Sequence, residues 1–202
     1  MFPLLIPLIV IAGSLLIGAT IAALCKKAQK IAIFGTTESG KTTLWRALQG
    51  LPVGGSYYAT AERSGVRSFK FTKSNGDTVT VAKGYDIPGK DDIFQNACDS
   101  ILNEDKMVVL FLVSAIDVMS GNIYESGARL RKIKMIIKGH KKCAIILFLT
   151  HRRDFISKYG EGRISQVIGK AHECFDKYTK EGYHLLELTN SSDVNKVKDL
   201  FK

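Results

Sequence analysis

The chain has few cysteines, and their spacing excludes two classes of site. Its 202 residues contain four cysteines and no C-x-x-C pair, and the four lie far apart, at Cys25, Cys98, Cys143 and Cys174. Neither a zinc site nor a disulfide framework is therefore indicated. Cys143 falls in a strand-like run and Cys174 in a helix-like one, so both are expected to be small core residues. Reduced thiols fit the cytosol.

Acidic residues are scarce relative to basic ones. The sequence has 19 aspartates and glutamates against 29 lysines and arginines, which gives a formal net charge of +10. An excess of this size favours an anionic partner, such as lipid headgroups, nucleic acid or an acidic protein. The chain lacks a recognised RNA- or DNA-binding signature, so a nucleic-acid role is not expected.

The first part of the chain lacks charge altogether. Residues 2–24 form an uncharged run of 23 residues, which is long enough to cross a hydrocarbon core of about 30 Å. A cleaved signal peptide is disfavoured because the basic start is missing and the run is too long, and a buried core helix is usually shorter. The run is followed by Lys26 and Lys27. The positive-inside rule therefore predicts a single-pass transmembrane anchor over residues 1–25, with residues 26–202 facing the cytosol.

What the chain does have is one strong motif. Eight residues fit the pattern G-x-x-x-x-G-K-[ST], the phosphate-binding loop of nucleotide-hydrolysing proteins: Gly35, Thr36, Thr37, Glu38, Ser39, Gly40, Lys41 and Thr42. An apolar run at 31–34 precedes them and suits a buried strand, and a helix-like run at 43–50 follows and ends at a glycine. A chance glycine-rich turn is the alternative, but both flanks fit the strand, loop and helix that the motif requires.

The residue types in this loop suit phosphate binding. Gly35 and Gly40 allow backbone conformations that a side chain would block, so that N–H groups converge on phosphate oxygens at a helix N-terminus. Lys41 is expected to reach the β- and γ-phosphates, and Thr42 to offer its hydroxyl to Mg²⁺. The predicted nucleotide contacts of this stretch are Gly35, Thr37, Glu38, Ser39, Gly40, Lys41, Thr42 and Thr43.

A second candidate motif follows a predicted hairpin. Strand-like runs at 66–71 and 78–85 flank a turn that contains Asn-Gly, which is a strong hairpin signal. The tetrapeptide D-I-P-G at 86–89 comes directly after them. There Asp86 would hold Mg²⁺, directly or through water, and the N–H group of Gly89 would sense the γ-phosphate. Alone, such a tetrapeptide is only a turn, but its place after a phosphate-binding loop favours the site.

The remaining pattern predicts a doubly wound α/β fold with a mostly parallel sheet and one antiparallel hairpin strand, because strands alternate with helices after the hairpin. The predicted strands are 107–115, 143–149 and 184–188, and the predicted helices are 91–103, 122–139, 162–180 and 194–201. Basic residues crowd the helix at 122–139, at Arg129, Arg131, Lys132, Lys134 and Lys138. A solvated face is the default interpretation of these charges, and a surface for lipid or an acidic partner is the alternative.

A candidate base-reading segment follows the strand at 143–149. Ligands of doubly wound sheets bind at the carboxyl ends of strands, and Asp154 is expected there to accept hydrogen bonds from N1–H and the exocyclic amine of guanine. The stem and planar head of Arg152 would lie over the base. The loop at 189–193, with Asn190, would offer backbone N–H groups to the guanine oxygen. Helix caps are the alternative for Asp154 and for this loop.

With these motifs together, residues 30–202 resemble a small GTPase of the Ras-like superfamily. The phosphate-binding loop matches the first GTPase motif, and residues 86–89 match D-x-x-G. Residues 151–154 fall where the family has N-K-x-D, and residues 189–191 where it has S-A-K. With a transmembrane segment joined directly to a G domain, the chain looks most like the β subunit of the signal recognition particle receptor, and residues 39–44 also look Arf-like. The resemblance implies GTP or GDP and Mg²⁺ as cofactors.

The chain departs from the family pattern at positions that affect selectivity and turnover. His151 and Arg152 replace the family's Asn and Lys, which resembles the T-R-K-x-D variant of a separate GTPase group. Lys90 stands where Ras-like enzymes carry the glutamine that orients the attacking water, and Thr37 replaces a glycine. Hydrolysis is therefore expected to be slow or to need an activating protein.

The resemblance also implies a first switch, in which a threonine closes on Mg²⁺ and the γ-phosphate. Thr60 is the candidate, with Ser64 as the alternative, and it joins Lys41 as an expected catalytic residue. The sequence thus predicts a membrane-anchored small GTPase that binds GTP or GDP with Mg²⁺, hydrolyses GTP slowly and recruits a cytosolic protein partner. Two alternatives remain open: a constitutively GTP-bound membrane-tethered binding module, which Lys90 favours, and a P-loop ATPase.

Overall fold

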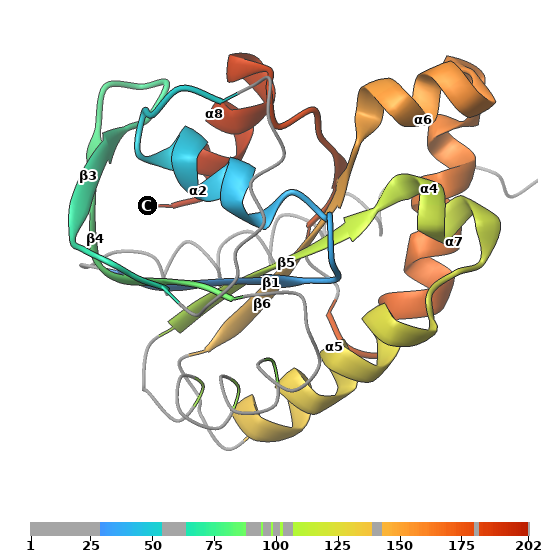
Figure 1. Cartoon of the computed structure of the whole chain (residues 1–202), viewed down its shortest axis with the longest axis horizontal. Coiled ribbons are helices and arrows are strands. Elements are labelled where there is room, and N and C mark those ends of the chain that lie inside the picture. Colours follow the sequence, from blue (N-terminus) through green and yellow to red (C-terminus); the bar gives the residue numbers. More distant parts are fainter. Residues whose placement is uncertain are drawn as a thin grey trace, which may run out of the picture.

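The computed structural model describes residues 29–53, 64–87, 94, 98, 102, 107–138, 143–179 and 182–201. In that part of the chain, a mixed sheet of seven strands forms the centre, and helices cover both of its faces (Figure 1). The strands are β1 (Gln29–Gly35), β2 (Ser64–Val66), β3 (Phe69–Thr72), β4 (Thr78–Asp86), β5 (Met107–Ser114), β6 (Ala144–Thr150) and β7 (Gly182–Leu185). The helices are α2 (Lys41–Leu48), α4 (Ala115–Ser120), α5 (Tyr124–Ile137), α6 (Arg152–Tyr159), α7 (Ile164–Phe175) and α8 (Ser191–Asp199), with a 3₁₀ turn η1 (Glu161–Arg163) before α7.

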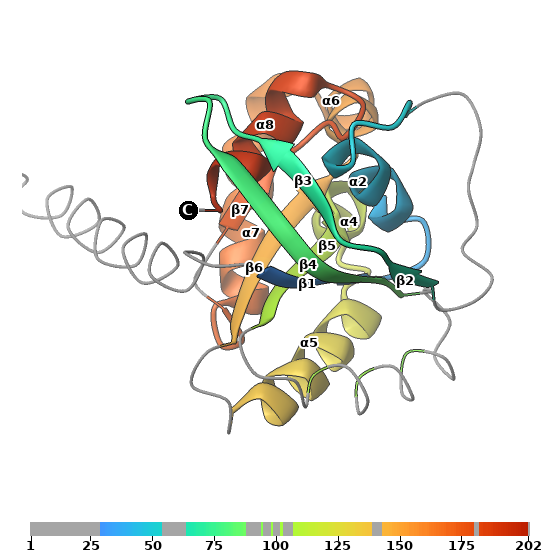
Figure 2. The same cartoon turned by 90° about the vertical axis from the view of Figure 1, so that its left-hand side faces the viewer.

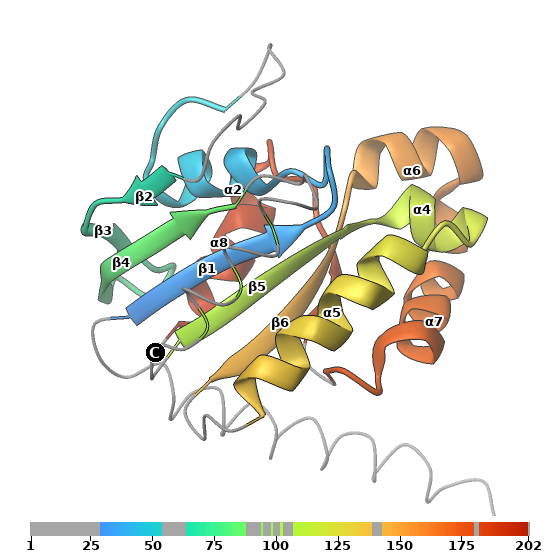
Figure 3. The ribbon, with the colours of Figure 1, turned by 60° about the horizontal axis from the view of Figure 1, so that its bottom comes forward.

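The sheet is parallel around the strand that precedes the phosphate-binding loop. β1 lies between β4 and β5 and is parallel to both, and β5, β6 and β7 continue the parallel part in that order. β2 and β3 pair antiparallel with β4. All of β5 except its last residue is buried, as are the last six residues of β6. Burial on both faces explains why these two runs lack polar alternation. Figure 3 shows β1, β5 and β6 running toward one common edge.

Two hydrophobic cores lie on the two faces of the sheet. On one face, α2 and α8 pack through a core that includes Trp45 and Phe201. On the other face, α4, α5, α6 and α7 pack through a core that includes Phe155 and Phe175 (Figure 2). Cys143 and Cys174 are only partly buried at the margin of this second core, which corrects the expectation that both are core residues.

The predicted order of strands and helices is confirmed, with corrections at their bounds. The predicted strand 66–71 is two strands, β2 and β3, which are separated by Arg67 and Ser68. The last strand lies at 182–185, and the last helix begins at Ser191. Two short helices, α4 and α6, are absent from the prediction. α4 continues directly from β5, and α6 buries only Phe155, so neither has a clear apolar repeat.

Some predicted features lie outside the described residues. They are the anchor over residues 1–25, Thr60, Gly89 and Lys90. Of the predicted helix at 91–103, three residues are described, and two of these, Phe94 and Cys98, are helical. Among the helices of the described ranges, none combines the length and the apolar character that crossing a membrane requires.

Candidate functional site

At the end of β1, the backbone turns tightly into the phosphate-binding loop. A Cβ on Gly35 would lie 2.4 Å from the carbonyl oxygen of Leu112 and 2.4 Å from the hydroxyl of Ser39, so only glycine fits there. Glu38 and Gly40 have left-handed conformations, with φ of 61° and 89°, on either side of Ser39. Alternating backbone handedness turns successive N–H groups toward one concave side, which favours an anion. α2 begins directly after this loop.

The carbonyl oxygen of Thr36 accepts hydrogen bonds from two polar side chains of the loop. Lys41 Nζ donates to it at 2.5 Å, and Ser39 Oγ donates to it at 2.9 Å. Lys41 is only 6% exposed, so its ammonium group is shielded from bulk water. Shielding from water strengthens the attraction of the ammonium group for an anion. Of the other predicted contacts in the loop, two are exposed and two are half-buried: Thr37 and Glu38, and Thr42 and Thr43.

A buried arginine supports the loop from α5. Arg129 is 3% exposed, and its Nη1 donates to the carbonyl oxygen of Gly35 at 2.8 Å. Its Nη2 lies 2.5 Å from Oε1 of Glu125, and its guanidinium lies 4.9 Å from the ring centre of Phe94. The expectation that Arg129 belongs to a solvated face is therefore wrong. The helical spacing could have predicted this burial, because Arg129 is four residues before the buried Ile133 and so lies on the same helix face.

The candidate Mg²⁺ ligands come from one strand end and from the helix that follows the neighbouring strand. Asp86 ends β4 and pairs in register with Ile33 of β1, two residues before the phosphate-binding loop. Thr42 is the second residue of α2, which follows that loop. Carboxylate and hydroxyl oxygens are the hard donors that Mg²⁺ prefers. The described residues contain no group of three or more histidines, cysteines, aspartates or glutamates that could hold a metal ion, and a site completed by phosphate oxygens does not require one.

On the base side, His151 joins two of the predicted motifs. It follows β6 in a left-handed conformation with φ of 62°, as the residue before α6. Its Nε2 lies 2.7 Å from the carbonyl oxygen of Glu38, so Nε2 is the donor in this bond. Its Nδ1 lies 3.4 Å from Oδ2 of Asp154. The imidazole therefore places the segment at 151–154 directly against the phosphate-binding loop.

Arg152 lies beside two carboxylates. Its guanidinium nitrogens are 3.7 Å from Glu161 and 3.9 Å from Asp193. Asp193 is buried, and it accepts hydrogen bonds from the backbone N–H of Glu187 at 2.8 Å and from Lys196 Nζ at 2.5 Å. Burial alone would raise the pKa of Asp193, but these bonds and the two cations lower it below its ordinary value. The contact of Arg152 with a base remains a prediction.

The loops that follow β6 and β7 are bonded to each other. The backbone N–H of Arg152 donates to the carbonyl oxygen of Leu186, and the N–H of Arg153 donates to Oε2 of Glu187 at 3.1 Å. Asn190 caps α8, since its side-chain oxygen accepts from the N–H of Ser192 at 2.8 Å. The cap alternative is thus confirmed for Asn190, and its contact with guanine stays a prediction.

Comparison with known proteins relates this arrangement to a described fold. No family model and no curated protein matches the chain. Among solved structures, it matches the Roco2 RocCORdC protein of Methanosarcina barkeri bound to GDP, with a TM-score of 0.56 and 14% identity over 85% of this chain. It also matches the bacterial selenocysteine-specific elongation factor EF-Sec, with a TM-score of 0.59 and 17% identity over 86% of this chain. The fold is that of a P-loop GTPase. The chain spans 48% and 28% of those two longer proteins.

Within this P-loop GTPase fold, the described site residues gather at one edge of the sheet. The phosphate-binding loop follows β1, Asp86 ends β4 beside it, and Asp154 follows β6. Among the hydrogen bonds described for residues 151–154, the one from His151 to the carbonyl oxygen of Glu38 joins this segment to the phosphate-binding loop. The sequence pattern did not assign this role to His151, which it treated as a departure from asparagine.

Proposed function

We propose that this chain is a membrane-anchored small GTPase that binds GTP and GDP with Mg²⁺ and works as a slow switch. The observation that carries the proposal is the bond from His151 to the carbonyl oxygen of Glu38, because it brings the base-side loop against a phosphate-binding loop whose lysine is buried. Both loops lie at the carboxyl edge of the sheet, where ligands of doubly wound folds bind. A neighbour in fold, the Roco protein, is described as bound to GDP, which supports guanine nucleotide as the ligand.

The chain's own residues bind and orient the nucleotide in this proposal. The concave N–H groups of the loop and the ammonium of Lys41 hold the β- and γ-phosphates. The side chain of Asp154 is 65% exposed, so its carboxylate is accessible to the paired N–H donors of guanine. Arg152 and Asn190 border the base, and the N–H of Gly89 responds to the γ-phosphate. Adenine presents no such donor pair to Asp154, and this difference selects guanine.

The proposed Mg²⁺ ligands are Thr42, Thr60 and Asp86. When bound, the ion would offset the negative charge of the nucleotide's phosphates. Thr42 lies on α2, directly after the phosphate-binding loop that follows β1, and Asp86 ends the neighbouring strand β4, which supports their sharing one ion. Thr60 enters through the family resemblance, as the residue that closes the first switch.

Slow turnover and a membrane location complete the proposal. Lys90 takes the place of a water-orienting glutamine, and Thr37 takes the place of a glycine in the loop, where it is exposed. The nucleotide then holds the switch segments in one state for long periods, which suits recruitment of a cytosolic partner, and an activating protein would shorten that state. The uncharged run at 2–24 anchors the chain, with the G domain in the cytosol, where the nucleotide is found.

Lys90 also favours a second candidate, a constitutively GTP-bound binding module without hydrolysis. In that case the nucleotide is structural, and the membrane-tethered domain presents one fixed surface to its partner. A P-loop ATPase is a third candidate, because His151 and Arg152 replace the usual base-reading residues. The two candidates differ from the main proposal in measurable properties: turnover for the first and base selectivity for the second.

The test is nucleotide affinity and single-turnover hydrolysis of the full chain in detergent or nanodiscs, with Mg²⁺ and GTP, GDP or ATP. We expect tight binding of GTP and GDP, weak binding of ATP and slow release of phosphate. Lys41→Ala and Asp86→Ala should each lose tight binding, because they remove a phosphate ligand and a Mg²⁺ ligand. Lys158→Ala on exposed α6 is the matched control and should bind as the unchanged chain does.

The outcomes separate the candidates. Tight GTP binding without turnover would select the constitutive module, and a preference for ATP would overturn the role of Asp154. Unchanged GTP affinity in both Lys41→Ala and Asp86→Ala would refute the assignment of the nucleotide site as a whole.

A further inference from the structure

The second half of α5, together with the residue that caps its C-terminus, presents a basic stripe to solvent. Its exposed members are spaced three or four residues apart and so share one helix face: Arg131, Lys134, Met135 and Lys138. Five basic residues and no acidic residue occur between Ser126 and Lys138. One of the five, Arg129, is buried under the phosphate-binding loop, so the exposed charge comes from the others. We call the four exposed residues the α5 stripe.

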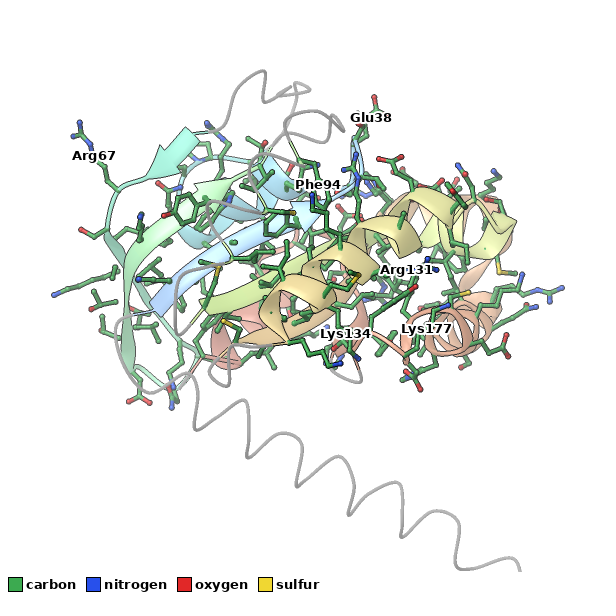
Figure 4. The ribbon with its side chains drawn as sticks, turned by 90° about the horizontal axis from the view of Figure 1, so that it is seen from below. Glu38, Arg67, Phe94, Arg131, Lys134 and Lys177 are labelled. Atoms are coloured by element: carbon green, nitrogen blue, oxygen red, sulfur yellow. The ribbon has the colours of Figure 1, made fainter. Side chains whose placement is uncertain are left out.

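The α5 stripe contains an exposed apolar side chain and borders a further lysine. Met135 is 71% exposed, although it lies on the same helix as the buried Ile133 and Ile137. Lys134 Nζ donates to the carbonyl oxygen of Lys177, just after α7, at 2.6 Å. Figure 4 shows Arg131, Lys134 and Lys177 together where α5 and the end of α7 meet. Cations around an exposed apolar side chain suit the interface of an anionic bilayer, where both can gain.

Strand register locates this surface at the edge of the sheet opposite the nucleotide. Lys30 of β1 pairs with Met107, and Val108 pairs with Ala144, so β1, β5 and β6 begin at one level. α5 ends at Ile137, seven residues before Ala144, and the C-terminal end of the α5 stripe therefore lies near that level. Figure 3 shows this end of α5 beside the start of β6.

β1 begins at the same edge, and the uncharged run lies just before β1 in the sequence. Four residues, 25–28, separate that run from β1, and four residues reach no further than about 14 Å. β6 is two strands from β1, about 10 Å away. A bilayer that holds residues 2–24 thus begins at most about 14 Å from the start of β1, a distance comparable with the ~10 Å range over which anionic headgroups attract basic side chains. This step rests on the proposed anchor.

We propose that the α5 stripe, with Lys177, docks the G domain on anionic lipid headgroups and sets its orientation on the membrane. The charges of Arg131, Lys134 and Lys138 contact the headgroups, and Met135 enters the interface. β1 spans about 20 Å from its start to the phosphate-binding loop, so the docked domain holds its nucleotide edge away from the bilayer. Nucleotide and a cytosolic partner then reach that edge without competing with lipid.

The test places a photo-crosslinking amino acid, benzoylphenylalanine, at Met135 of the full chain. The protein is reconstituted into vesicles of phosphatidylcholine alone or with 30% phosphatidylserine, illuminated, and analysed for lipid adducts. A probe at the exposed Ser165, at the other end of α7, is the positional control. Arg131→Gln with Lys138→Gln removes two charges of the stripe, and Lys158→Gln with Arg163→Gln removes two exposed charges elsewhere.

We expect lipid adducts at position 135 on phosphatidylserine vesicles, few at position 135 on pure phosphatidylcholine and few at position 165 on either. The stripe variant should lower the ratio of docked to undocked domain by about fivefold for each charge removed, and the matched variant should leave it unchanged. Adducts that are absent at 135, or insensitive to both lipid charge and the stripe variant, would overturn the docking proposal. Failure of the chain to float with either vesicle would instead overturn the anchor.

Discussion

Arg129 joins three segments that are distant in the sequence. It starts on α5, donates to the carbonyl oxygen of Gly35 in the phosphate-binding loop and lies over the ring of Phe94. The carbonyl that it binds belongs to the residue where the chain leaves β1 for the loop. A buried cation in this position fixes the entry of the loop, and Glu125 offsets its charge at the helix surface.

Replacing Arg129 with Met should therefore destabilise the fold and disorder the start of the loop. Loss of a buried, charged hydrogen bond costs about 2–3 kcal/mol, and nucleotide affinity should fall as well. Urea unfolding and nucleotide titration measure the two effects. Lys138→Met, exposed at the C-terminal end of the same helix, is the control and should change stability by less than about 0.5 kcal/mol. Equal unfolding midpoints for the two variants would refute the supporting role of Arg129.

His151 carries a second residue-scale prediction. Its Nε2 donates to the carbonyl oxygen of Glu38, and an asparagine amide offers a donor of similar reach. We expect His151→Ala to weaken nucleotide binding about fivefold, the worth of one hydrogen bond, and His151→Asn to retain most of the affinity. Nucleotide dissociation rates measure both. His172→Ala, on α7, is the control for loss of an imidazole. If His151→Ala and wild type release nucleotide at the same rate, the bond does not couple the two loops.

At the scale of elements, α2 packs on β4 through a tryptophan seated on a glycine. A Cβ on Gly84 would lie 2.4 Å from Cη2 of Trp45. The indole Nε1 donates to the carbonyl oxygen of Tyr85 at 3.0 Å, which fixes the ring over the strand. The helix that begins at the phosphate-binding loop is thereby held against the strand that ends at Asp86, so this contact sets the spacing between two parts of the site.

Gly84→Ala should push the indole off the strand and destabilise the protein by about 1–3 kcal/mol, as overpacking does. Trp45 is the single tryptophan of the chain, so its fluorescence reports the change directly, with emission shifted to longer wavelength. Gly169→Ala, in α7 with open space around it, is the matched control and should stabilise by up to about 1 kcal/mol. An unshifted emission spectrum in Gly84→Ala would contradict this packing.

The sequence predicted elements well where burial is complete and poorly where it is one-sided. β5 and β6 were expected within one residue of their observed bounds because they are apolar on both faces. The turn between β1 and α2 was placed correctly because its motif is local. Arg129 and the bond between His151 and Glu38 were missed because they join residues 94 and 113 positions apart, and a single sequence does not reveal such pairings.

At the scale of the whole molecule, the lowered pKa values of several carboxylates indicate that acid limits the stability of the fold. The pKa values of four of them lie below their ordinary values: Asp77, Glu187, Asp193 and Asp199. Asp193 is the buried member, and it ties the loops after β6 and β7 together through Glu187 and Arg152. A chain with a formal charge of +10 gains further positive charge as these groups take up protons, which adds self-repulsion.

Protonation of Asp193 in acid should therefore lower the stability of this protein. Because its pKa is lower in the folded than in the unfolded chain, its stabilising effect is complete above the unfolded value of about 4 and is lost as pH falls below that value. We expect urea midpoints that are level from pH 7 to pH 5 and fall between pH 4 and pH 3. Asp193→Asn should be less stable at pH 7 and lose less on acidification, whereas Asp77→Asn, which is exposed, should follow the unchanged chain because solvent screens its interactions. An acid dependence in Asp193→Asn as steep as that of the unchanged chain would place the acid-sensitive group elsewhere.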